Sequence, residues 1–252
     1  YVQEEIDTDQ DGFLSQEEID RCTNINVSYK SIKSLAGIEI FSSLTDLYCA
    51  QNDLSSLDVS QNTALVTLYC SGNNLSSLDV SQNTALESLG CAQNDLSSLD
   101  VSQNTALESL DCAQNDLSSL DVSKNQTLTR LNCRSCKLSS VDVSKNPALV
   151  TLDCSNNDLT TLDVSKNPEL RTLWCESNRL SSLDLEKNPK VGGRDNFLMY
   201  NNQITVSLSA ANQFDLSTLP GFDVSRVASV TGGSISGNIL TVDAGAETVS
   251  YE

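Results

Sequence analysis

The sequence predicts an α/β solenoid, in which short coils of chain stack into one elongated domain. Three observations indicate this fold: cysteines recur at every 21st position, leucine and valine fill the same positions within each step, and aromatic residues make up only 5% of the 252 residues. A coil this short cannot bury its own apolar face, so it depends on its neighbours for a core. The cysteines in step are Cys49, Cys70, Cys91, Cys112, Cys133, Cys154 and Cys175.

Each step carries the frame L-x-x-L-x-C-x-x-N-x-L-x-x-L-D-V-S-x-N. Leu68 and Cys70 are two residues apart, so in a strand both point to the interior while Tyr69 points out. The chain turns at Asn73, returns through further apolar positions, and ends the coil at Asn83. We expect about nine such coils, stacked right-handed at ~4.8 Å, with their strands forming a parallel sheet on the concave side.

Two columns of polar residues are expected to be buried. We interpret the first, an asparagine column, as bonding turn backbone groups, with Cys136 as a tolerated weak donor that interrupts it. The second is an aspartate column with two interpretations: carboxylates that accept backbone N–H bonds in each Asp-Val-Ser turn, or a calcium ladder. We favour the first, because calcium-binding repeats bring Gly-rich turns. The columns are Asn52, Asn73, Asn94, Asn115, Asn157 and Asn178, and Asp58, Asp79, Asp100, Asp121, Asp142, Asp163 and Asp184.

The cysteine column is expected to consist of free thiols. Parallel inward side chains one strand spacing apart lie ~4.8 Å from each other, which exceeds the ~3.5–4.5 Å between Cβ atoms that a disulfide prefers. Buried thiols of this kind act as small apolar side chains and are unreactive. Cys22 lies outside the column and has no assigned role.

The N-terminal segment fits the EF-hand calcium loop D-x-D-x-D-G-x5-E over residues 7–18. Oxygen ligands at these spacings suit Ca²⁺, and Gly12 permits the sharp turn. We predict one structural Ca²⁺ as cofactor, in an EF-hand-like helical cap; the alternative is a cap that keeps the loop sequence without the ion. The predicted ligands are Asp7, Asp9, Asp11, the Phe13 carbonyl, Ser15 and Glu18.

At the other end the repeat frame loosens. Phe197, Met199, Asn202 and Ile204 are expected to complete a final coil, after which the spacing changes to that of short strands with Gly or Asn turns. Those strands would form a β-rich C-terminal cap; they are expected at 204–208, 237–242 and 248–251. The expected domains are an N-terminal cap over 1–24, the solenoid over 25–204 and the C-terminal segment over 205–252.

The composition excludes several classes of function. With 15 Lys+Arg against 34 Asp+Glu the formal net charge is -19, which disfavours nucleic acid as a partner because phosphate backbones bind Lys and Arg. The chain has no His, so Ser-His-Asp and Cys-His nucleophile pairs are absent. No apolar run approaches the ~18 residues of a transmembrane helix. We expect a protein that is not an enzyme and has no transmembrane segment.

A repeat every 21 positions with one in-register Cys per coil resembles that of the cysteine-ladder internalins, bacterial surface proteins with leucine-rich repeats. The resemblance covers roughly residues 5 to 204, and residues 32–44 resemble an internalin first repeat. It implies a secreted or cell-surface bacterial adhesin without catalysis, an EF-hand-like cap, and an immunoglobulin-like domain after the repeats, of which 205–252 would be a truncated part. It further implies that the partner is a host or neighbouring-cell glycoprotein or protein. We expect a monomer; the alternative function is a structural spacer that displays another module.

Outward-pointing strand residues line the concave face, where solenoids commonly bind partners. One interpretation is a glycan or protein platform, with aromatic rings that stack on sugars or anchor a partner; the other is packing on a strand surface. Asp111 and Asp153 lie on the order of 9.6 Å apart at strand spacing, but an open face does not exclude water as a glycosidase site requires. The candidate contacts are Tyr48, Tyr69, Asp111, Arg130, Arg134, Asp153, Arg171 and Trp174.

Overall fold

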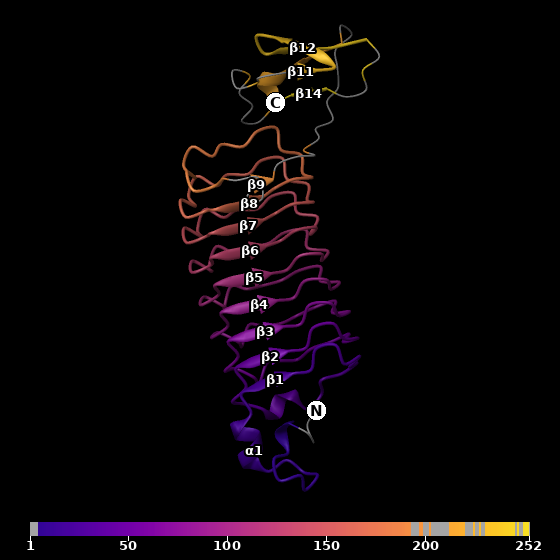
Figure 1. Cartoon of the computed structure of the whole chain (residues 1–252), viewed down its shortest axis with the longest axis vertical. Helices are drawn as coiled ribbons and strands as arrows, with labels where there is room; N and C mark the ends of the chain where they lie inside the picture. The colour runs from indigo at the N-terminus through magenta and orange to yellow at the C-terminus, as the bar shows by residue number, and fades with distance from the viewer. Residues whose placement is uncertain are drawn as a thin grey trace.

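A computed structural model describes residues 5–192, 197–198, 202, 212–219, 224, 227, 230–244, 246 and 249–251. Its main feature is a sheet of nine strands in the order of the chain, from β1 to β9 (Figure 1). All its neighbouring strands are parallel. The strands are β1 (Asn24–Asn26), β2 (Asp46–Tyr48), β3 (Thr67–Tyr69), β4 (Ser88–Gly90), β5 (Ser109–Asp111), β6 (Arg130–Asn132), β7 (Thr151–Asp153), β8 (Thr172–Trp174) and β9 (Phe197–Leu198).

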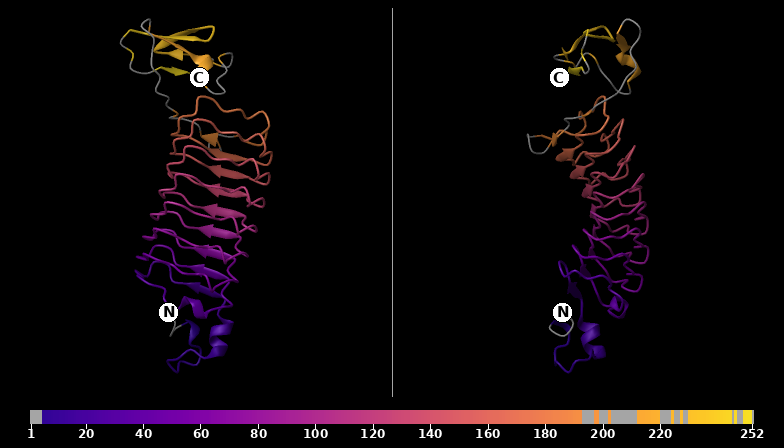
Figure 2. Two further views of the ribbon diagram at one scale, coloured as in Figure 1. Left: turned by 180° about the vertical axis from the view of Figure 1, so that it is seen from behind. Right: turned by 90° about the vertical axis from the view of Figure 1, so that its right-hand side faces the viewer.

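Equivalent residues of successive coils are direct neighbours in this sheet. Leu68 pairs with Leu89, and Leu89 with Leu110, each one repeat further along the chain. The right-hand view of Figure 2 shows the stack of coils bowed, with the strands on the inner side of the curve. The predicted stacked solenoid with a parallel sheet is therefore confirmed.

The coils contain less helix than an α/β solenoid implies. In the described part of the chain the α-helix is α1 (Gln16–Arg21), which precedes the sheet. The first coil holds a short 3₁₀ helix, η2 (Ile38–Ile40), and the later described coils return through turns. A coil of 21 residues has to run once around the core and return to the sheet, which leaves too few residues for a helix of several turns, since each turn takes about 3.6 residues. The fold is accordingly a β-solenoid with a short helix at its start.

Stacked columns of leucine, valine and cysteine form the core. In the coil from Leu65 to Val80, the side chains of Leu65, Leu68, Cys70 and Leu75 are all 0% exposed. The described cysteines are all free and buried, as predicted. Burial raises the pKa of the thiols in the cysteine column, to about 12 for Cys49, because a thiolate loses its hydration in the interior.

The asparagine column bonds each coil to the one before it, as predicted. The Asn94 amide nitrogen donates to the Cys91 carbonyl of its own coil at 3.0 Å and to the Cys70 carbonyl of the preceding coil at 3.1 Å. Its Oδ1 accepts the Leu75 N–H at 3.0 Å. One side chain thus satisfies three backbone groups of two coils, and Asn202 extends the column by donating to the Cys175 carbonyl at 3.2 Å.

Cys136 replaces asparagine in one coil. Its thiol lies 3.2 Å from the Cys112 carbonyl, so it supplies a single weak donor in place of an amide. In the described coils on either side, asparagine oxygens accept the N–H groups of Leu96 and Leu138. The equivalent Leu117 N–H has no such acceptor among the described residues. This coil is the weak point of the column.

The expected burial of the aspartate column is wrong. All seven of these aspartates are exposed, because each sits at a turn on the rim of its coil. Their predicted hydrogen bonds are present: Asp100 Oδ1, for example, accepts the Ser102 N–H at 2.8 Å. This bond lowers the pKa of Asp100, and the same bond acts on most of the column.

A second asparagine column, not anticipated as a buried ladder, occupies the interior instead. Asn104 is 0% exposed and donates to the Val80 and Asn83 carbonyls of the preceding coil, both at 2.9 Å. Its Oδ1 has no hydrogen-bond partner in the described structure. The members of the column are Asn62, Asn83, Asn104, Asn125, Asn146, Asn167 and Asn188.

Two small antiparallel sheets follow the solenoid. One joins β10 (Gln213–Asp215), β13 (Ile239–Val242) and β12 (Gly233–Ser236), and the other joins β11 (Val230–Thr231) and β14 (Ser250–Tyr251). The strands expected near 237–242 and 248–251 are therefore present, and 204–208 lies outside the described residues, as do Met199 and Ile204. The β-rich C-terminal cap is confirmed, whereas the domain boundaries stay predictions.

Replacing Cys136 with asparagine should stabilise the protein. The amide would restore two donors and the missing acceptor for the Leu117 N–H, which is worth about 1 kcal/mol. The reverse change, Asn115→Cys, should lower stability by a similar amount. Urea unfolding of both variants measures this, and a Cys136→Asn variant less stable than the parent chain would contradict the proposed role of the column.

Acid should destabilise the solenoid through the aspartate column. The backbone hydrogen bonds lower the folded pKa of Asp79, Asp100 and Asp121 below the unfolded value of 3.8. Their contribution to stability is therefore complete above that pH and is lost as the pH falls through the folded pKa. Urea unfolding should show a stability loss toward about pH 3 that is smaller in a triple Asp→Asn variant at these positions, whose amide oxygens still accept the turn N–H. Equal losses in both proteins would rule this out.

Candidate functional site

The concave face carries one outward-pointing residue per coil at the position before each ladder cysteine. Sheet register places these residues side by side, as the pairs Tyr48 with Tyr69 and Asp153 with Trp174 show. From β2 to β8 the row reads Tyr48, Tyr69, Gly90, Asp111, Asn132, Asp153 and Trp174. Aromatic side chains thus occupy both ends of the row, and planar polar side chains occupy its middle.

Gly90 makes room for the ring of Tyr69. A Cβ atom at Gly90 would lie 2.9 Å from Cδ1 of Tyr69, closer than carbon atoms approach in ordinary contact. The Tyr69 hydroxyl lies 2.9 Å from the Ser88 hydroxyl on the same neighbouring strand. The ring of Tyr48 packs against it edge to face, with 5.5 Å between ring centroids. Tyr69 is therefore held across β4 by contacts on both sides.

A hollow of about 450 Å³ lies on this face and takes its lining from strands β3 to β8. Tyr69 lines one end and Trp174 the other, with Asp111, Arg130 and Asp153 between them. Its volume falls in the usual range of small-molecule sites, ≈ 300–1,000 Å³. Five of the eight predicted contact residues thus meet in one hollow.

Three neighbouring side chains in the row are anchored in the same way. Oδ1 of Asp111, Asn132 and Asp153 accepts the backbone N–H two residues further on, at 3.2, 3.1 and 3.0 Å. Oδ1 of Asp153 also accepts the Ser155 hydroxyl at 2.6 Å. These bonds fix the orientation of each side chain, and they were not expected from the sequence.

The two carboxylates sit in partly desolvated positions. Asp153 is only 7% exposed. Desolvation raises the pKa of Asp111, and the charge of Asp153 adds to this effect against the lowering by the Ala113 N–H. In the described part of the chain neither carboxylate forms an ion pair.

The other predicted contacts lie around the hollow. Tyr48 is not part of the lining, but its ring contacts that of Tyr69, which is. Arg134 and Arg171 are exposed and also lie outside the lining. Gly90 and Asn132 line it without having been predicted. Gly90 could have been singled out from the sequence, because the other positions of its row, from Tyr48 to Trp174, carry larger side chains. All eight residues remain predicted ligand contacts.

The acidic N-terminal loop brings three carboxylates together. Oxygen atoms of Asp7, Asp9 and Asp11 lie within 4.8 Å of one another, so this triad is able to hold a metal ion. Asp7 Oδ2 accepts the Gly12 N–H at 3.0 Å, and Gly12 has φ +87°. Asp7 is 4% exposed, and its Oδ1 is buried without a hydrogen-bond partner in the described structure.

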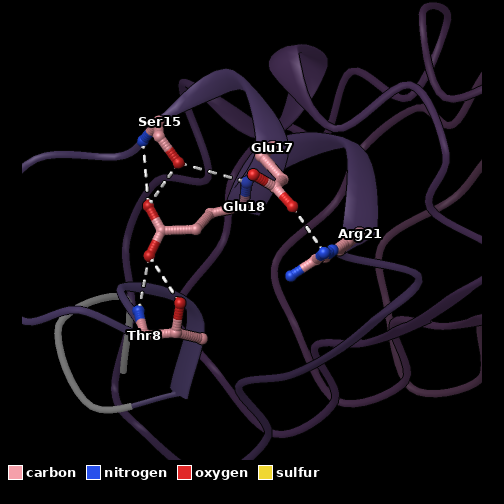
Figure 3. A network of polar contacts seen from close by, with 5 residues as sticks. All are labelled: Thr8, Ser15, Glu17, Glu18 and Arg21. Atoms are coloured by element: carbon pink, nitrogen blue, oxygen red, sulfur yellow. Dashed lines mark hydrogen bonds and ion pairs between the residues drawn. The ribbon is translucent and has the colours of Figure 1, made fainter.

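Glu18 has a different role in this structure from the other acidic residues. Its carboxylate accepts N–H and hydroxyl bonds from Thr8 at 2.6 and 2.8 Å and from Ser15 at 2.9 and 2.8 Å (Figure 3). The bond from the Ser15 N–H does most to lower the pKa of Glu18, to about 2. Ser15 and Glu18 form a capping box for α1, while Phe13 is an exposed side chain. Their roles as metal ligands stay predictions.

Comparison with known proteins identifies the class. Residues 147–187 match the family of Leucine Rich repeats (2 copies). The functional domain of InlJ from Listeria monocytogenes, which includes a cysteine ladder, is similar with a TM-score of 0.72 and 41% sequence identity over 76% of this chain and 43% of that chain. No curated protein matches the sequence.

Two further structures share the fold. A leucine-rich repeat protein of Leptospira interrogans has a TM-score of 0.61 at 19% identity, over 70% of this chain and 55% of that one. Internalin C2 of Listeria monocytogenes has a TM-score of 0.61 at 16% identity, over 74% of this chain and 84% of that one.

The stacked coils, the parallel sheet and the repeat frame together define a leucine-rich repeat protein. Its ladder of cysteines and its similarity to the InlJ domain place it more narrowly: the chain is an InlJ-like leucine-rich repeat protein with a cysteine ladder. It spans less than half the length of that InlJ domain. No helix in the described residues is long and apolar enough to cross a membrane.

Proposed function

We propose that this protein is a non-catalytic adhesin of a bacterial surface that binds a host or neighbouring-cell glycoprotein, glycan or protein on its concave face. The observation that carries the proposal is the hollow between Tyr69 and Trp174, a preformed site of small-molecule size on an exposed sheet. The similarity of the chain to the InlJ domain supports secretion or display at the cell surface. The carboxylates face an open sheet and not a closed cavity, which supports binding over catalysis.

Loss of either aromatic end of the hollow should weaken binding. On an array of glycans and mucin glycoproteins, the parent chain should bind, and Trp174→Ala or Tyr69→Ala should lose at least tenfold in affinity, since aromatic anchors dominate interface energies. Tyr29→Ala is the matched control, because Tyr29 is 78% exposed and lies outside the hollow. An array on which the parent chain binds nothing would favour the alternative function, a structural stalk that displays another module.

We further propose that the loop over 7–18 binds one structural Ca²⁺ and locks an N-terminal cap, residues 1–24, onto the solenoid of residues 25–204. The buried, unpartnered Oδ1 of Asp7 supports this, because an uncompensated buried carboxylate oxygen is costly and a cation would satisfy it. The exposed carboxylates of Asp9 and Asp11 complete a set of hard oxygen ligands. The third unit, residues 205–252, would close the far end.

Chelation should therefore lower the melting temperature. At calcium about 100-fold above Kd, binding stabilises by ≈ 2.7 kcal/mol, which corresponds to about 5 °C or more for a protein of this size. Asp7→Ala with Glu18→Ala should abolish the response to chelation. Asp9→Asn with Asp11→Asn should also abolish it, while the amide oxygens still accept the Asp11 and Phe13 N–H groups as the carboxylates do. Asp95→Asn should leave the response intact. A parent chain that melts at the same temperature with and without chelator would contradict a calcium-locked cap.

A further inference from the structure

We propose that the hollow between Tyr69 and Trp174 binds an uncharged saccharide chain, which lies along the solenoid axis with its hydroxyl groups on Asp111, Asn132 and Asp153. The inference deepens the proposed function and rests on the concave face being the binding surface. Three features of the hollow carry it: its fixed pattern of hydrogen-bonding groups, its charge and its aromatic ends.

The hydrogen-bonding pattern is acceptor, donor, acceptor. Because Oδ1 of Asp111, Asn132 and Asp153 is held by the chain's own N–H groups, each side chain has one remaining polar arm. That arm is a carboxylate oxygen at Asp111 and Asp153 and an NH₂ group at Asn132, at successive steps of ~4.8 Å. None of the three arms has a hydrogen bond to the described residues. A hydroxyl both donates and accepts, so a row of hydroxyl groups fits all three.

The charges in and beside the hollow disfavour a charged ligand. An anionic group would meet the carboxylates of Asp111 and Asp153. A cationic group would meet Arg130, which lines the hollow, and it would approach the exposed Arg134, which lies two residues after the end of β6 and outside the lining. The net charge of -19 adds little at this range, because charges beyond ≈ 8 Å are screened at physiological ionic strength. An uncharged polar ligand avoids both repulsions.

The ends of the hollow supply flat apolar surfaces. The ring of Tyr69 lies over Gly90, where a side chain would collide with it, and its hydroxyl group is held by Ser88. At the other end, Trp174 is the neighbour of Asp153 on the adjacent strand. Strands β3 and β8 are five steps apart, or ~24 Å at strand spacing. A ligand that uses both ends must be a chain of several rings, because a single sugar cannot span this length.

Trp174 permits a direct test, since it is the only tryptophan of the chain. Its fluorescence would be titrated with maltohexaose and chitohexaose as long uncharged probes, with lactose as a short one, with sialyllactose as the anionic partner of lactose, and with the peptide Ac-Gly-Arg-Gly-NH₂ as a cation. We expect a saturable change with at least one uncharged oligosaccharide. If lactose is the one that binds, sialyllactose should bind more weakly.

Variants of the same shape identify the contacts. Asp153→Asn keeps the anchored oxygen and turns the free acceptor into a donor, which should weaken binding about tenfold because a charge-assisted bond is lost. Asn132→Asp should weaken it similarly by removing the donor. Asp95→Asn, an exposed carboxylate outside the hollow, should change nothing. Circular dichroism confirms that each variant is folded.

The outcomes separate the two proposals. A response to sialyllactose or the arginine peptide alone, a response to no probe, or binding that Asp153→Asn and Asn132→Asp both leave unchanged would each overturn the saccharide assignment. If the parent chain nevertheless binds an intact glycoprotein and Trp174→Ala abolishes that binding, the concave face remains the binding surface and the ligand is a protein.

Discussion

The stack of coils depends on register between neighbours. Backbone pairing of three-residue strands is too short to determine register alone, and the asparagine side chains supply the rest. Asn94 bonds carbonyl groups of two coils and the N–H of Leu75 at once, so a slip of one residue would break all three bonds. The buried amide would then lose about 1–3 kcal/mol for each unsatisfied group. Leucine and cysteine columns form because this register is held.

The same constraint produces the binding face. Residues separated by 21 positions become neighbours on one row, so each coil contributes one side chain to the hollow and can change it without altering the core. Gly90, Asp111 and Trp174 differ in chemistry, although they share one frame position and the same buried flanking residues. The repeat thus separates stability, which lies in the interior columns, from recognition, which lies in the outward row.

A strict period made the solenoid, the free cysteines, the first asparagine column and the outward row predictable from sequence. The period alone does not determine which side of a turn faces the core. For this reason the aspartate column was wrongly expected to be buried, and the buried column of Asn104 and its equivalents was not expected. The anchoring of Asp111, Asn132 and Asp153 depends on backbone geometry after each strand. The place of Gly90 depends on a ring from the preceding coil. Neither the anchoring hydrogen bonds nor the role of Gly90 can be predicted from the sequence of one repeat.

The stacking of coils in register can be tested by removing one complete coil. Deleting residues 84–104 joins Asn83 to Thr105 and takes out one full repeat, after which every remaining column should close up in register. Stacking in register predicts a cooperatively folded protein, slightly less stable than the parent chain because one interface between coils is lost, with cysteines that stay unreactive to a thiol reagent until urea unfolds it. A deletion variant that is unfolded, or whose ladder thiols react under native conditions, would contradict it.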